Sequence, residues 1–354
     1  MKKLSRLLSF LVFMSHSTLA VNIAYLSPCK EDAACTYWNE VQQLMEKAAK
    51  DLGVNLYTLY DSHDNNFREQ ADKVRYIKKL SVKPDFVILT PLPSQVSLNT
   101  LKELEALKIH SFIISGEIPP AEKMLYQKPQ QKFKYWFGHM YGNNEAAGYL
   151  LAQRLASESS SMMALAGSNM HSESENRVDG LKDYVAETNI ILNQIVPTDW
   201  TEQQGYYKTS KLLNRYKDIN SIWTAGHRLA FGASKAVLEA NLDKTIKIGT
   251  FNWTADTLAE LKAKHIYVSI GGHSITGALA IVLLHDAYHR HDFITFNGTR
   301  QIPVELIAAT VDNLDDTILR YKTWFTFNFK NISKVYNPSM STHYINVLPP
   351  RAAN

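Results

Sequence analysis

The alternation of short apolar runs with longer amphipathic stretches is the feature that most constrains the fold of this 354-residue chain. β-Branched and aromatic runs such as "NIAYLS" and "DFVILTP" recur from residue 22 to beyond residue 300, and helical patterns lie between them. This order is typical of parallel sheets whose faces are covered by helices. The sequence therefore predicts an α/β fold.

A first series of elements fills the chain up to Ser115. We expect helices near residues 37–52, 66–80 and 95–108, and Gly53 suits a left-handed cap after the first of them. The four strands of this series are expected at "NIAYLS", "VNLYTLY", "DFVILTP" and "HSFIIS". The Pro-, Lys- and Gln-rich stretch that follows, residues 117–134, predicts a surface excursion without a regular element.

A second series of strands and helices begins at "YWFGHM". Its further strands are expected at "MMALAG", "QIVP", "SIWTAG", "KIGTFN" and "YVSIGG", and a final strand at residues 302–311. An apolar helix, "SITGALAIVLLHDAYHRH", comes before that strand and is expected to be buried against a sheet. Beyond Asp312 the alternation is lost, and the chain is expected either to pair as edge strands or to drape over a lobe.

The length of the chain predicts two lobes, because a single core seldom grows beyond about 250–300 residues. We expect an N-terminal lobe of residues 21–141 plus 273–300 and a C-terminal lobe of residues 142–272 plus 301–312. Three crossings between the lobes, near residues 141, 272 and 300, would form a hinge. Residues 313–354 are left as a C-terminal extension.

The first twenty residues have the organisation of an export signal. A basic start, "MKKLSR", precedes the short apolar run "LLSFLVFM" and the small residues "STLA", with a cleavage site after Ala20. An uncleaved N-terminal anchor is the alternative. Both readings export the protein, and we expect it in the periplasm.

Charge argues against a nucleic acid as partner. Removal of residues 1–20 takes away three basic and no acidic residues, so the formal net charge falls from +4 to +1. A near-neutral surface lacks the positive potential that attracts phosphate backbones. A repressor is also disfavoured, because nothing but the export signal precedes the first strand.

The only two cysteines of the chain, Cys29 and Cys35, lie in the loop after the first strand. In an oxidising compartment a disulfide that closes this loop is the favoured reading. Two unrelated thiols are the alternative. A metal site built from this pair alone is disfavoured, because structural zinc takes four ligands.

Polar, small and aromatic residues follow most of the predicted strands. Ligands of open parallel sheets bind outside the carboxyl ends of the strands, so these positions are the candidate site. They include "CTYW", "SGE", "GSNMHSESENR", "TDW", "AGHR", "FNWT" and "GGHS". Two lobes that each offer such an edge would enclose a small polar molecule between them.

From about residue 22 to 311 the order of these motifs resembles the type I periplasmic substrate-binding proteins, which include the ribose-binding protein and the autoinducer-2 receptor. The resemblance implies two Rossmann-like lobes joined by a three-crossing hinge. It gives Tyr37 and Trp38, which open the first helix, a place against the ligand. It also implies that Arg177, in "RVDG", binds the ligand through its side chain. Trp200 is expected to pack on the other face of the ligand.

The chain departs from the family pattern at several ligand positions. His227, in "GHRLAFG", replaces an aspartate, and Asn252, in "GTFN", stands where a second aspartate is usual. His273 falls near the late glutamine or arginine, and Ser115 with Gly116 replaces the pair "DR". These replacements argue against a simple pentose as ligand.

Other roles are possible for each of these residues. Tyr37 and Trp38 would serve equally as core packing at the start of a helix, and Arg177 would serve as a surface residue paired with Glu173. His227 and His273 have the alternative of solvated loop histidines.

A separate pair, His285 and His289, lies four residues apart in "HDAYHRHD", a spacing that can bind zinc. A third ligand other than His291 or Asp292 is not in sequence reach. A polar helix end, where cationic groups offset the helix dipole, is the favoured reading of this cluster. We therefore expect no metal site.

Binding rather than catalysis is the expected function. The motifs "GxSxG", "GxxxxGK[ST]", "GxGxxG" and "HExxH" are absent from the sequence, and no cofactor is expected. Two roles remain: delivery of a sugar-like solute to an ABC-type permease, or presentation of ligand occupancy to a membrane sensor kinase or similar receptor. In either role a monomer is expected.

Overall fold

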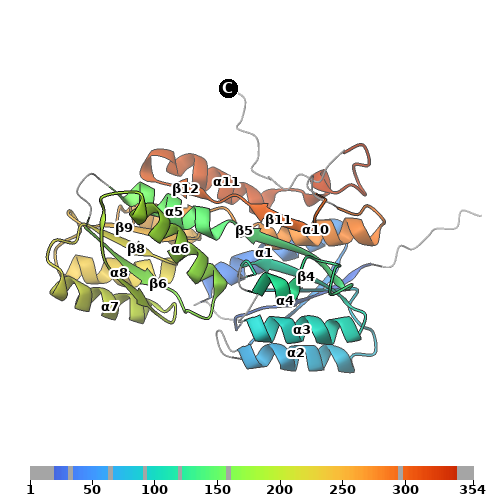
Figure 1. Ribbon diagram of the computed structural model, residues 1–354. Helices are drawn as coiled ribbons and strands as arrows, with labels where there is room; N and C mark the ends of the chain where they lie inside the picture. The colour runs from blue at the N-terminus through green and yellow to red at the C-terminus, as the bar shows by residue number, and fades with distance from the viewer. Residues whose placement is uncertain are drawn as a thin grey trace, which may run out of the picture.

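The computed structural model describes residues 20–30, 35–62, 67–90, 94–118, 122–156, 161–293 and 298–340. Two lobes lie side by side, each a six-stranded sheet flanked by helices (Figure 1). This is the expected two-lobe α/β architecture. The predicted signal peptide, residues 1–20, falls outside the described residues except for Ala20.

The first lobe is built on a sheet with the strand order β11-β5-β4-β3-β1-β2, in which all neighbours are parallel. Its strands are β1 (Asn22–Leu26), β2 (Asn55–Leu59), β3 (Phe86–Leu89), β4 (His110–Ser115), β5 (Trp136–Gly142) and β11 (Gln301–Val304). Its helices are α1 (Thr36–Leu52), α2 (Phe67–Lys79), α3 (Ser94–Ala106), α4 (Lys123–Tyr126) and α10 (Thr276–Tyr288).

The second lobe has the corresponding strand order β12-β10-β9-β8-β6-β7, in which only β12 is antiparallel to its neighbour. Its strands are β6 (Ser161–Ala166), β7 (Ile191–Pro197), β8 (Ser221–Thr224), β9 (Lys247–Phe251), β10 (Val268–Gly271) and β12 (Ile307–Ala309). Its helices are α5 (Asn144–Leu155), α6 (Ser172–Ala186), α7 (Glu202–Arg215), α8 (His227–Glu239) and α9 (Ala255–Lys262).

Alternation along the strands supplies apolar side chains to both faces of the first sheet. In β1, Ile23 and Tyr25 belong to the core on the side of α1, whereas Ala24 and Leu26 belong to the core with α2 and α3. Successive side chains of a strand point to opposite faces, so a sheet covered on both sides needs apolar residues at every position. This is why the strands read as continuous apolar runs.

Helix α10 is buried over almost its whole length, as its apolar sequence predicts. It packs against α1 so closely that a Cβ on Gly277 would lie 2.6 Å from Cγ of Met45. Helix α1 ends where Gly53 takes φ +72°, and its amide bonds to the carbonyl of Ala49. The left-handed cap predicted at Gly53 is therefore present.

The prediction of a single final strand at residues 302–311 is wrong, because the structure has two short strands there that belong to different sheets. β11 pairs with β5 at the edge of the first sheet, and β12 pairs with β10 at the edge of the second. Residues 301–304 therefore lie in the first lobe rather than the second, and the third crossing follows Val304 instead of residue 300. Pro303 has no amide hydrogen to donate, which an edge strand tolerates.

The excursion at 117–134 contains one short helix, α4, so the expectation of no regular element there is wrong. Tyr126 and Phe133 are buried and fix this segment to the core of the first lobe. In contrast, Met124 and Leu125 are exposed.

The C-terminal extension does not pair as edge strands within its described part. It forms η2 (Val311–Asn313), α11 (Leu314–Thr326) and η3 (Phe329–Ile332), and it runs from the second lobe to the first (Figure 1). On the second lobe, the indole of Trp324 stacks on that of Trp253 with ring centres 6.3 Å apart. We call residues 311–340 the C-terminal strap.

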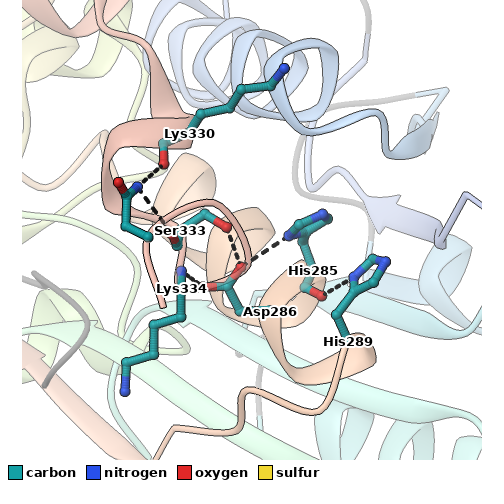
Figure 2. Close-up of polar contacts among 7 residues, drawn as sticks. His285, Asp286, His289, Lys330, Ser333 and Lys334 are labelled. Atoms are coloured by element: carbon teal, nitrogen blue, oxygen red, sulfur yellow. Dashed lines mark hydrogen bonds and ion pairs between the residues drawn. The ribbon is translucent and has the colours of Figure 1, made fainter. Parts of the chain in front are cut away.

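On the first lobe the strap is held by α1 and α10. Lys47 donates to the carbonyl of Phe327 at 2.7 Å, and Asp51 accepts from the amide of Phe329 at 2.9 Å. At the end of α10 the buried carboxylate of Asp286 accepts from the Ser333 hydroxyl at 2.5 Å and from the Lys334 amide at 2.6 Å (Figure 2). The strap therefore contacts both lobes.

No helix within the described ranges combines the length and the hydrophobicity needed to cross a bilayer.

Candidate ligand-binding site

A cavity of about 380 Å³ lies between the two lobes, at the carboxyl ends of the strands. Both sheets contribute to it, because the chain leaves each strand toward the gap between the lobes. Its walls are formed by Pro28, Cys29, Cys35, Thr36, Tyr37, Trp38, Thr90, Gly116, His171, Ser172, Glu173, Arg177, Asp199, Trp200, Thr201, Gly226, His227, Arg228, Asn252 and His273. Seven of the eight residues singled out as ligand contacts from the sequence are among them.

Tyr37 and Trp38 form the aromatic wall on the first lobe. Their rings meet edge to face with centres 4.9 Å apart, and the Tyr37 ring lies 5.1 Å from that of His273. The Tyr37 hydroxyl is buried and has no hydrogen-bond partner among the described residues. Burial raises its pKa well above the ordinary value, so the hydroxyl stays protonated and can donate to a ligand.

The cysteine loop brings these aromatics to the cavity. Cys29, after β1, and Cys35, directly before α1, form a disulfide, and both line the wall. The bond closes a loop between the end of β1 and the start of α1. It thereby restrains the first turn of α1, which carries Tyr37 and Trp38.

Arg177 comes from α6 in the second lobe and is almost fully buried. Its Nε donates to Oδ1 of Asn144 at 2.9 Å, and its Nη1 donates to the carbonyl of Ala225 at 2.7 Å. The guanidinium lies 4.1 Å above the ring of Phe251. Within the described part of the chain Nη2 makes no hydrogen bond, so this donor remains for a ligand.

The position of Arg177 depends on a close approach of α5 and α6. A Cβ on Gly148 would lie 1.9 Å from the carbonyl oxygen of Arg177, and one on Gly180 would lie 1.9 Å from that of Glu145. Glycine at both places lets the two helices touch backbone to backbone.

The alternative in which Arg177 is a surface residue paired with Glu173 is wrong. Arg177 is buried, and the described residues show no ion pair between the two side chains. Glu173 lines the cavity itself, and burial raises its pKa against the opposing effect of the nearby guanidinium.

Trp200 forms the aromatic wall on the second lobe. Its backbone is left-handed, with φ +71°, and its indole lies against two glycines. A Cβ on Gly167 would stand 2.0 Å from the ring, and one on Gly226 would stand 3.2 Å from it. The indole Nε1 donates to Nδ1 of His171 at 2.8 Å, and the two rings stack.

His227 joins the lobes. Its Nδ1 lies 3.0 Å from the amide nitrogen of Asn252, and its Nε2 lies 2.8 Å from the hydroxyl of Thr36 in the first lobe. Because the amide donates to Nδ1, the imidazole hydrogen is on Nε2 and points to Thr36. Burial, with Arg228 and Arg177 nearby, lowers the pKa of His227 to about 3, so the ring is neutral.

Two more histidines of the cavity are kept neutral by burial. The pKa of His273 is lowered to about 3, with a further contribution from Arg177, and that of His171 is lowered to about 4. Nδ1 of His273 is buried without a hydrogen-bond partner among the described residues. The alternative of solvated loop histidines is therefore wrong for His227 and His273, which are both buried.

Ser115 is the one predicted contact that does not line the cavity. It is buried at the end of β4 with φ +78°, directly before Gly116, which does line the wall. Asn252 takes the same conformation at the end of β9, with φ +76°. Left-handed backbone turns the chain sharply at the ends of both strands.

Sequence reasoning missed several wall residues as individual contacts: Thr36, Thr90, His171, Glu173, Asp199 and Arg228. Their positions after strands were the available signal. No residue type at these positions distinguished a wall residue from an ordinary loop residue.

An aromatic-walled cavity between two α/β lobes is the arrangement of a solute-binding protein. The periplasmic binding protein domain family matches residues 27–287, most of the chain, and the chain belongs to this family.

Individual relatives are distant. The ribose import binding protein of Haemophilus influenzae is 24% identical over 250 residues, which cover 67% of this chain and 76% of the relative. A periplasmic sugar-binding protein from Pseudomonas fluorescens has a similar structure, with a TM-score of 0.79 at 23% identity over 91% of this chain and 97% of that one. A chain in the structure of a XylFII–LytSN complex matches with a TM-score of 0.68 at 17% identity. The match covers 83% of this chain and 99% of that one.

Proposed function

We propose that this protein is exported to the periplasm, closes around a small sugar-like molecule and delivers it to an ABC-type permease. The observation that carries the proposal is the cavity between the lobes, which has aromatic walls on both of them. Trp38 lies on one side and Trp200 on the other, and rings of this size offer rigid apolar area to the faces of a sugar ring. A cavity of about 380 Å³ also falls within the usual range of small-molecule sites.

The polar groups of the cavity favour a ligand with several hydroxyls and no large net charge. Unpartnered groups include the Tyr37 hydroxyl, Nδ1 of His273 and Nη2 of Arg177. Two acidic and two arginine side chains line the wall, so their charges offset one another. Together these groups suit an uncharged ligand that can both donate and accept.

The experiment is a thermal-unfolding panel of pentoses, hexoses, sugar alcohols and sugar acids, followed by calorimetric titration of the ligand found. A ligand that binds only the native state raises the melting temperature by mass action. Trp38→Ala and Arg177→Ala are each expected to abolish this shift while the protein remains folded. Tyr207→Ala, an exposed aromatic outside the cavity, is the matched control and should bind normally. Retained binding in both cavity variants would overturn the proposal.

Binding without turnover is part of the proposal. Incubation of the protein with the bound sugar should return the sugar unchanged on chromatography.

A role in sensing is the second candidate, and two observations favour it. A protein of similar fold is known in a complex with a second protein, XylFII with LytSN. Exposed apolar side chains also occur on both lobes, at Met124 of the excursion and at Met170 after β6. Loss of solute uptake in a deletion strain would support transport. Normal uptake, with loss of a transcriptional response to the ligand, would support sensing.

A further inference from the structure

Two histidines at the end of α10 lie outside the ligand cavity and form a pair. His285 and His289 are four residues apart, and their rings lie on the same side of the helix, with centres 4.6 Å apart (Figure 2). The His285 side chain is only 4% exposed, and His289 is partly buried. The polar helix end expected from the sequence is therefore buried at His285.

The hydrogen bonds of the pair fix the tautomer of each ring. Nδ1 of His285 lies 3.0 Å from Oδ1 of Asp286, and Nδ1 of His289 lies 2.9 Å from the backbone carbonyl of His285. Because both acceptors are oxygens, each Nδ1 carries its hydrogen, and in the neutral ring the lone pair is on Nε2. Metal-binding histidines are oriented in this way, with the second ring nitrogen donating to a carboxylate or a backbone carbonyl.

Neither Nε2 atom has a hydrogen-bond partner in the described structure. The two Nε2 lone pairs are therefore available to a group that accepts them. A metal ion is such a group, and it would use both lone pairs.

The separation of the rings agrees with a shared ion. An ion about 2.0–2.1 Å from each Nε2 lies about 3.2 Å from each ring centre. If both Nε2 atoms point at the ion, the ring centres would be about 4.5 Å apart when the two metal–nitrogen bonds meet at a right angle. They would be about 5.2 Å apart when these bonds meet at the tetrahedral angle. The 4.6 Å observed is of this size. Imidazole nitrogen suits Cu²⁺, Ni²⁺ and Zn²⁺, and the affinity of a given site for divalent first-row metals is highest for Cu²⁺.

We propose that His285 and His289 form a two-histidine site for a divalent late transition metal, with Cu²⁺ bound most tightly and Ni²⁺ next. In the described ranges no group of three or more His, Cys, Asp or Glu side chains could hold a metal ion. Water would therefore occupy the other coordination positions of an ion bound by the two histidines. Free thiols do not compete for the ion, because the two cysteines of the chain are joined to each other.

The proposed site also touches the anchor of the C-terminal strap. Asp286 orients His285 and at the same time accepts from Ser333 and Lys334 of the strap. The ring of Tyr336 stacks on that of His285, with centres 6.0 Å apart. A bound ion would fix His285 and, through these contacts, hold the strap on the first lobe.

The test is calorimetric titration of tag-free mature protein with Cu²⁺, Ni²⁺, Zn²⁺ and Mg²⁺. We expect one saturable site, with affinity falling from Cu²⁺ to Ni²⁺ and no binding of Mg²⁺. Acidification should weaken binding, because protons compete for the same lone pairs. The paramagnetic resonance spectrum of the Cu²⁺ form should show coupling to two imidazole nitrogens.

Variants locate the ion and separate this site from incidental binding. His289→Ala removes a partly exposed ligand and should abolish binding, with an unchanged circular dichroism spectrum. His265→Ala removes an exposed histidine of the second lobe, paired with Glu260, and should leave binding unchanged. In hydrogen exchange, Cu²⁺ should protect residues 328–340 in the wild type but not in His289→Ala.

Two results would overturn the proposal: no saturable binding of Cu²⁺ or Ni²⁺, or equal binding by the wild type and a folded His289→Ala. The second result would mean adventitious binding elsewhere. Neither result bears on the sugar-binding proposal, because the histidine pair lies outside the ligand cavity.

Discussion

Thr36 and His227, which both line the cavity, join the two lobes, with 2.8 Å between the hydroxyl oxygen and Nε2. Thr36 opens α1 of the first lobe, and His227 opens α8 of the second. In the proposed function the lobes close around a ligand, and this contact between them would then stabilise the closed form.

Replacement of Thr36 by valine should weaken ligand binding. The substitution keeps the shape of the side chain but leaves the buried Nε2 hydrogen of His227 without an acceptor in the closed state. This penalty is about 1–2 kcal/mol, equal to an affinity loss of roughly 5- to 30-fold. Titration of the ligand found in the panel measures it. Thr36→Ser keeps the hydroxyl and should bind like the wild type, so equal weakening in both variants would refute the role of the hydrogen bond.

Glu40 should make stability depend on pH. Burial raises its pKa to about 7, although hydrogen bonds from the Tyr321 hydroxyl and the Ala255 amide act in the opposite direction. Asp256 nearby adds to the rise. The folded protein thus holds a proton that the unfolded chain releases near pH 4.5.

The sign of the effect follows from that difference. The contribution of Glu40 to the free energy of unfolding is fully present below about pH 4.5 and is lost as the pH rises to about 7. The size of this contribution is about 1.4 kcal/mol for each unit by which the pKa in the folded protein exceeds that in the unfolded chain. Glu40→Gln should lack this loss and should be more stable than the wild type at pH 8. Urea unfolding at pH 5 and pH 8, at constant ionic strength, provides the comparison. Parallel pH profiles for the two proteins would contradict the prediction.

Gly167→Ala should abolish ligand binding by displacing Trp200. The added methyl group would stand 2.0 Å from the indole, which has to leave the cavity wall. Gly226→Ala places a methyl group 3.2 Å from the same ring and should have a milder effect. Calorimetry on both variants tests the order. Stronger impairment by the substitution at Gly226 would contradict the position of the indole.

Loss of the disulfide should destabilise the protein and weaken ligand binding. The bond joins residues six positions apart, and the chain-entropy model gives about 2 kcal/mol for a loop of this length. Binding should weaken because the loop restrains the first turn of α1. The Cys29→Ser/Cys35→Ser variant should melt at a lower temperature than the wild type. A reducing agent should lower the melting temperature of the wild type only; an equal effect on both would point to another cause.

The fold was predictable because its signal is local. Apolar runs such as "DFVILTP" lie in strands covered on both faces, and the cap at Gly53 follows from the freedom of glycine at positive φ. The region from Gln301 to Ala309 was predicted wrongly for a physical reason: the two short strands β11 and β12 are adjacent in sequence but belong to different sheets. Only the three-dimensional pairing with β5 and β10 separates them.

The candidate site was predictable in its location rather than in its details. Strand ends identified Trp200 and His227, since parallel strands bring their carboxyl ends to one edge. The hydrogen bond of His227 to Thr36 spans 191 residues and depends on how the lobes meet, which the sequence does not encode locally. The same holds for the contact of Glu40 with Tyr321.

The C-terminal strap is a fourth connection between the lobes, in addition to the three crossings of the chain. Its Trp324 rests on the second lobe and its Ser333 on the first, so a wide rotation at the hinge cannot leave both contacts in place. For the lobe motion proposed here, the strap is therefore a tether whose detachment adds to the free energy of opening. The width of the opening would then depend in part on residues that lie outside the ligand cavity.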